Sequence, residues 1–128
     1  MSDNESDKAT RVLVVEDDPH QLEIYSTLLY YNGYEVREAA SMYEAVDRIA
    51  QEKPDVILLD VMLPDANGLD AALLMSRTPA TADIPIVCMT AYDVEPRRAQ
   101  ASGCAELLQK PVDGAILVEA IDRALNES

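Results

Sequence analysis

The sequence of 128 residues contains no tryptophan and no phenylalanine, and its aromatic residues are six tyrosines. Aliphatic side chains must therefore build the core, and a chain of this length buries about two thirds of its unfolded surface as one domain. An apolar run of about 18 residues is also lacking, so no membrane-spanning helix is expected. Residues 1–7 are acidic and lack the apolar core of a signal peptide. A cytoplasmic protein is the expectation.

Cysteine and basic residues are scarce as well. Cys88 and Cys104 do not have the spacing of a metal site, and the apolar run around Cys88 predicts a small buried side chain. A disulfide between them stays open. Ten Lys and Arg against 24 Asp and Glu give a formal net charge of −14. Such a surface repels DNA phosphates, so no direct contact with nucleic acid is expected, and basic partners or cations are favoured.

Short apolar runs alternate with helical patterns along the chain. Strands are predicted at residues 11–15, 34–38, 56–60, 86–90 and 105–109. Helices are predicted to follow them, beginning near Pro19, Ser41, Gly68, Glu95 and Asp113. This alternation predicts an α/β fold in which helices cover both faces of a parallel sheet. Residues 1–9 are expected to form a flexible acidic tail and residues 10–128 the folded domain.

Chemically reactive residues stand at the carboxyl ends of four predicted strands. They are, in chain order, Glu16 and Asp17, Asp60, Thr90 and Lys110. Ligands of open parallel sheets bind outside the carboxyl ends of the strands, so these side chains are expected to converge. Neighbouring carboxylates repel one another unless a cation neutralises them, and Mg²⁺ prefers oxygen ligands. A metal ion, a lysine and a nucleophilic carboxylate together suit a phosphoryl group in transit.

Each of these residues also has an ordinary structural explanation. An acidic run before a helix usually caps that helix, as Asp18 is expected to do, and an acid at a strand end usually belongs to a turn. A single lysine is usually a solvated surface charge. The order of all these residues at successive strand ends favours the functional interpretation.

Four segments of the sequence resemble the receiver domains of two-component response regulators. These segments are Val14–Asp18, Leu58–Pro64 with Gly68, Met89–Ala91 and Gln109–Pro111. The resemblance extends over about residues 10–125. It implies a flavodoxin-like fold like that of the chemotaxis regulators, with five parallel strands in the order 2-1-3-4-5 and five helices on both faces.

The resemblance also implies a magnesium site. It makes Asp60 the acceptor of the phosphoryl group and assigns Mg²⁺ to Glu16, Asp17, Asp60 and the backbone carbonyl of Met62. Asp17 would bind the ion directly, and Glu16 would act through a metal-bound water.

The remaining implied roles concern the phosphoryl group. Thr90 would hydrogen-bond to it and Lys110 would form an ion pair with one of its oxygens, so that both act with Asp60 in catalysis. The peptide bond between Lys110 and Pro111 is expected to be cis, as in the family.

Leu107 departs from the family pattern. Receivers usually carry Tyr or Phe three positions before the lysine, as the rotating partner of the switch residue Thr90. Leu107 lacks the ring, and we hypothesise that Tyr92 shares the switching task. Neither Met62 nor Tyr92 can position an attacking water, so slow autodephosphorylation is predicted.

The functional interpretation is a stand-alone response regulator. It would accept phosphate from a sensor histidine kinase or a histidine phosphotransfer protein, and then bind an unknown effector protein or relay the phosphate. It would catalyse only its own phosphorylation and dephosphorylation. A phosphohydrolase is disfavoured because Met62 replaces the second acid. A phosphorylation-independent interaction module stays open because of Leu107, and so does a homodimer.

Overall fold

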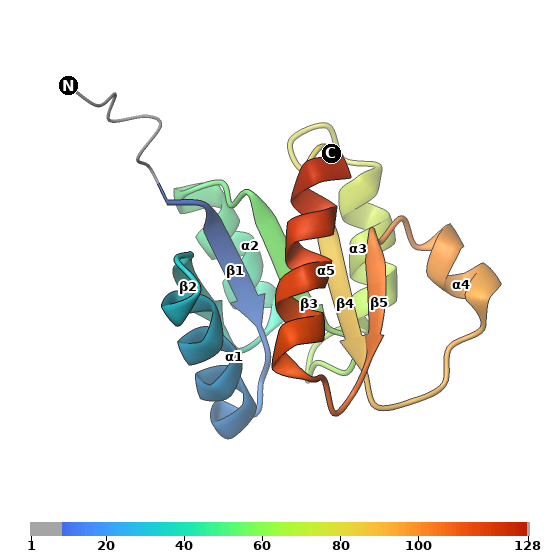
Figure 1. Ribbon diagram of the computed structural model, residues 1–128. Helices are drawn as coiled ribbons and strands as arrows, with labels where there is room; N and C mark the ends of the chain where they lie inside the picture. The colour runs from blue at the N-terminus through green and yellow to red at the C-terminus, as the bar shows by residue number, and fades with distance from the viewer. Residues whose placement is uncertain (1–8, 128) are drawn as a thin grey trace.

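The computed structural model describes residues 9–127, which form a five-stranded parallel sheet with helices on both faces (Figure 1). The strands are β1 (Arg11–Val15), β2 (Glu35–Ala39), β3 (Val56–Asp60), β4 (Ile86–Thr90) and β5 (Glu106–Gln109). The helices are α1 (Pro19–Tyr31), α2 (Met42–Gln51), α3 (Gly68–Ser76), α4 (Pro96–Ala101) and α5 (Gly114–Glu127). The sheet order β2-β1-β3-β4-β5 confirms the predicted fold class. The predicted tail lies outside the described residues except for Ala9.

Two strands begin later than the sequence predicts. The backbone N–H of Tyr34 donates to the carbonyl of Leu29 at 3.1 Å, which makes Tyr34 part of the turn that ends α1. The sheet ladder of β2 therefore begins at Glu35, the partner of Arg11. At the other edge, β5 begins at Glu106 rather than at residue 105.

Aliphatic side chains fill two separate layers of the core, as the lack of large aromatics requires. One layer, with Leu29, Leu58 and Leu117, lies between the sheet and helices α1 and α5, in front in Figure 1. The other, with Leu59 and Leu69, lies between the sheet and helices α2 and α3, behind the sheet. All five residues of β3 are buried, which is typical of a central parallel strand.

The two cysteines are free thiols that interact with each other. Cys88 is fully buried in β4, as predicted, and Cys104 packs against the same layer of the core. The hydrogen bond between the thiols raises the pKa of Cys88 and lowers the pKa of Cys104 to about 6.

Helix α4 differs from the other helices in how it is attached. It has six residues, none of them buried, and Figure 1 shows it standing away from the sheet beyond β5. Its N-cap residue, Glu95, makes no side-chain cap hydrogen bond. Arg98 joins it to Asp70 of α3 by an exposed ion pair of 3.4 Å. Few contacts therefore hold α4 in place.

Tyr34 joins the start of β2 to α5, and we predict that Tyr34→Phe weakens the fold. Its hydroxyl donates a hydrogen bond to the carboxylate of Asp122, and burial with this bond raises the pKa of Tyr34. Loss of the bond should lower the free energy of unfolding by about 1 kcal/mol, measured by urea denaturation. The control is Tyr30→Phe, because Tyr30 is 66% exposed. Equal midpoints for both variants would contradict the prediction.

Candidate functional site

Glu16 and Asp60 meet because their strands are neighbours in the sheet. Val15 of β1 is the register partner of Leu59 of β3, and each is followed by one of the two acids. Both carboxylates are buried, with residue exposures of 1% for Glu16 and 4% for Asp60. Asp17 is exposed beside them, and oxygen atoms of the three acids lie within 4.8 Å of one another. The structure thus brings together the three predicted carboxylates.

Lys110 reaches this cluster from the end of β5. Its backbone N–H donates to the carbonyl of Thr90 at 2.7 Å, and its peptide bond to Pro111 is cis. The ammonium group donates to Glu16 Oε1 at 2.7 Å and lies 3.3 Å from Asp60 Oδ1. One ammonium group therefore contacts both buried carboxylates.

The charges in this cluster are not balanced. Burial raises the pKa of Glu16, although its hydrogen bond from Lys110 opposes this change. Burial also acts to lower the pKa of Lys110, but contacts with Glu16 and Asp60 hold it above its ordinary value. Three carboxylates share one ammonium group, so negative charge is in excess. An oxygen-only donor set of this charge fits a hard divalent cation such as Mg²⁺.

Thr90 shares one cavity with Met62 and Tyr92, the two residues on which the prediction of slow autodephosphorylation rests. The cavity measures about 520 Å³, and Thr90, Met62 and Tyr92 all line it. The hydroxyl oxygen of Thr90 accepts the N–H of Tyr92 at 3.0 Å, while the Met62 N–H donates to Asp60 Oδ1 at 3.4 Å. Met62 and Tyr92 are 54% and 60% exposed, so their side chains border the site without closing it.

Leu107 lies on β5, the strand that pairs with the β4 strand of Thr90. It is the register partner of Cys88, and Thr90 follows Cys88 by two residues. Because alternate residues of a strand share a face, Leu107 and Thr90 lie on the same side of the sheet. Leu107 is partly buried against the layer that faces α2 and α3. The structure thus places the two residues on neighbouring strands and on the same face of the sheet.

Two residues near the site were not predicted from the sequence. The Asp65 carboxylate accepts the backbone N–H groups of Met42 and Tyr43, which lie more than twenty positions earlier in the chain. Tyr25 lines a second cavity of about 400 Å³ together with Lys110 and Pro111. Helical periodicity indicates only that Tyr25 faces the core, and no local pattern connects Asp65 with the start of α2.

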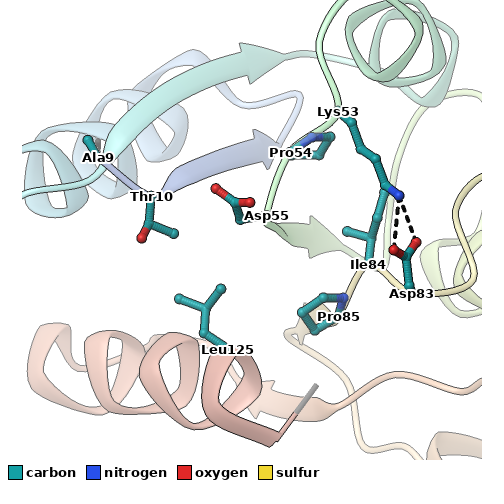
Figure 2. Close-up of a pocket in the computed structure, with 9 residues that line it drawn as sticks. All are labelled: Ala9, Thr10, Lys53, Pro54, Asp55, Asp83, Ile84, Pro85 and Leu125. Atoms are coloured by element: carbon teal, nitrogen blue, oxygen red, sulfur yellow. Dashed lines mark hydrogen bonds and ion pairs between the residues drawn. The ribbon is translucent and has the colours of Figure 1, made fainter. Parts of the chain in front are cut away.

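A larger cavity, of about 560 Å³, lies at the amino ends of the strands, opposite the predicted site (Figure 2). None of the predicted site residues lines it. The charged groups that line it already have partners. Lys53 contacts Asp83 at 2.9 Å, and Asp55 accepts the backbone N–H of Arg11 at 2.8 Å. The chemistry of the described residues is therefore concentrated at the carboxyl ends of the strands.

A comparison with known protein families shows the family to which this chain belongs. The family model of the response regulator receiver domain matches residues 12–122. The chain belongs to this family. This result confirms the resemblance to the receiver domains of two-component signalling systems that the sequence motifs indicated.

Known relatives of this receiver domain have similar length and structure. It is 32% identical to protein PilH of Pseudomonas aeruginosa over 90% of this chain and 97% of that protein. The polar-differentiation response regulator DivK of Brucella ovis is 28% identical over 91% and 97%. A putative response regulator from Chloroflexus aurantiacus superimposes with a TM-score of 0.87 at 31% identity, covering 93% of this chain and 99% of that one.

The chemotaxis response regulator CheY4 of Vibrio cholerae has the same fold, with a TM-score of 0.84 and 27% identity. The match covers 92% of this receiver domain and all of the CheY4 chain. Across residues 9–127, none of the helices has the length and apolar character needed to cross a bilayer.

Proposed function

We propose that this receiver domain accepts a phosphoryl group on Asp60 and changes conformation as a result. The observation that supports this most directly is the environment of the Asp60 carboxylate. It is nearly buried, lies 3.3 Å from the Lys110 ammonium group, and belongs to a cluster of acidic oxygens. The donor would be a sensor histidine kinase or a histidine phosphotransfer protein.

The transfer itself requires a nucleophile and a place for negative charge. An Asp60 oxygen would attack the phosphorus atom of a phosphohistidine, so that a P–O bond forms while the P–N bond breaks. Lys110 would then turn from Glu16 toward a phosphoryl oxygen, offsetting its charge.

A bound magnesium ion would supply further positive charge to the phosphoryl oxygens. The carboxylates of Glu16, Asp17 and Asp60 and the carbonyl of Met62 would hold it.

The proposed switch begins at Thr90. Its hydroxyl oxygen already accepts the Tyr92 N–H, which leaves the hydroxyl proton free to be donated to a phosphoryl oxygen. Movement of Thr90 would shift the start of the segment that leads to α4, and α4 is only lightly held. Phosphorylation would favour the conformation in which the protein makes the more favourable contacts with the phosphoryl group. An effector protein would bind the favoured conformation, or the phosphate would pass onward.

The domain would have no independent substrate and would catalyse only its own phosphorylation and dephosphorylation. Met62 stands where a second acid would serve a phosphohydrolase, and a thioether donates no proton. Slow loss of phosphate and a cytoplasmic location remain predictions.

The test of this proposal is phosphate uptake from acetyl phosphate or phosphoramidate with Mg²⁺, followed by intact mass. We expect one phosphoryl group on the wild-type protein and none on Asp60→Ala. Asp55→Ala is the matched control, because Asp55 is an exposed acid just before the opposite end of the same strand. Uptake by Asp60→Ala would contradict the assignment. Failure of the wild-type protein with every donor would favour the phosphorylation-independent interaction module.

A further inference from the structure

We propose that Asp65 is a positioning residue that holds the loop after β3 in place for metal binding. This inference rests on the proposed function, because it assigns the backbone of that loop to the magnesium site. Asp65 itself would contact neither the metal ion nor the phosphoryl group.

The loop of residues 61–67 is a narrow turn with a fixed base. The Gly68 N–H donates to the carbonyl of Val61 at 2.7 Å, and Met62 and Asn67 form an antiparallel bridge. Near the tip, the Leu63 N–H donates to the carbonyl of Ala66 at 3.2 Å. These bonds set the shape of the turn, but they do not connect its tip to the rest of the domain.

Asp65 connects the loop to the rest of the domain by hydrogen bonds, in addition to the packing of Leu63 against the core. Its Oδ1 accepts the Met42 N–H at 3.0 Å and its Oδ2 accepts the Tyr43 N–H at 2.9 Å. Both donors belong to the first turn of α2, where backbone N–H groups lack partners within the helix. These two bonds lower the pKa of Asp65, so its carboxylate stays ionised at neutral pH. Helix α2 also has its own cap, because Ser41 accepts the Glu44 N–H at 3.1 Å.

The start of α2 is connected in turn to the other half of the metal site. Helix α2 follows β2, whose last residue, Ala39, accepts the backbone N–H of Glu16 at 3.0 Å. A chain of contacts therefore runs from Glu16 through the end of β2 and the start of α2 to Asp65 and the loop of Met62. Asp65 closes this chain around the proposed site. Without it, only the bonds within the turn and the packing of Leu63 against the core would hold the loop. The loop would then vary more in position before the metal binds, which costs affinity.

Three variants separate loop positioning from charge and from helix capping. Asp65→Ala removes the charge and both bonds, whereas Asp65→Asn removes the same charge but keeps one acceptor oxygen. Ser41→Ala removes the helix's own cap and leaves the loop attached. The probe is Mg²⁺ alone, titrated by calorimetry, and hydrogen exchange of residues 61–68 in metal-free protein is the second measurement.

We expect Asp65→Ala to bind Mg²⁺ about tenfold more weakly and to speed exchange in the loop. Asp65→Asn should lie between Asp65→Ala and the wild-type protein, and Ser41→Ala should bind Mg²⁺ like the wild-type protein. Wild-type affinity and loop exchange in Asp65→Ala would overturn this inference alone. Equal losses in Ser41→Ala would overturn it too, since Asp65 would then act only as a cap. A wild-type protein that binds no Mg²⁺ would overturn both this inference and the metal site of the proposed function.

Discussion

Lys110→Met should lower the free energy of unfolding by about 3 kcal/mol at about pH 8, because it leaves buried carboxylates without a cation. Methionine keeps much of the apolar stem of Lys110, so the change removes mainly the charge. Glu16 is 1% exposed and would lose the hydrogen bond that Lys110 donates to it at 2.7 Å. Urea denaturation without Mg²⁺ measures the effect. Phosphate uptake should also slow by about 100-fold, because one charge that faces the phosphoryl oxygens is gone.

The pH dependence of this variant follows from Glu16. Burial raises the pKa of Glu16 above its ordinary value of 4.5, so the folded protein binds this proton more readily than the unfolded chain does. The associated stability is fully present below that ordinary value and is lost as the pH rises through the folded value. Without Lys110 the pKa rises further, because a lowering contact is removed. The destabilisation should therefore be smaller at about pH 5 than at about pH 8.

Two further variants test the cause of the Lys110 effect. Lys53→Met removes a lysine from an exposed ion pair with Asp83 and should change stability little. Adding Glu16→Gln to Lys110→Met should restore part of the lost stability, because one buried charge then needs no cation. If the double variant were as unstable as Lys110→Met, the unpaired Glu16 carboxylate would not be the cause of the loss.

Gly68→Ala is the second change with a large expected effect. A Cβ atom at Gly68 would lie 2.5 Å from the backbone oxygen of Asp60 and 2.8 Å from Val61 Cα. These are backbone atoms, so the strand end that carries the proposed phosphoryl acceptor would have to move. We expect a loss of about 3 kcal/mol in the free energy of unfolding, measured in urea, and weaker phosphate uptake.

The matched control for this change is Gly114→Ala. Gly114 also begins a helix, but its Cβ would meet Leu28 Cδ2 at 3.2 Å, the far end of a flexible side chain. Alanine also favours a helix more than glycine does, so stability should change little or rise. If both glycine variants lost the same stability, backbone crowding at Asp60 would not be the reason.

Local patterns in the sequence were sufficient for the fold class. Apolar runs and helix caps depend on neighbours within a few residues, so they identified all five strands and helices to within a few residues. The carboxyl ends of parallel strands share one edge, and the sequence therefore predicted that Glu16, Asp17 and Asp60 meet. The roles of these residues and of Thr90 in phosphate transfer stay predictions.

Tertiary structure decided what depends on distant residues. Lys110 pairs with Glu16, 94 positions away, because the strand ends bring the two side chains together at the same edge. Asp65 accepts a hydrogen bond from the first turn of α2, a contact that no local sequence pattern predicts. The position of α4, away from the sheet, was likewise visible only in the folded structure. The alternation of strand and helix patterns in the sequence determined which residues could gather at the site. Strand register and loop packing determined which atoms touch there, because those distances depend on the whole fold.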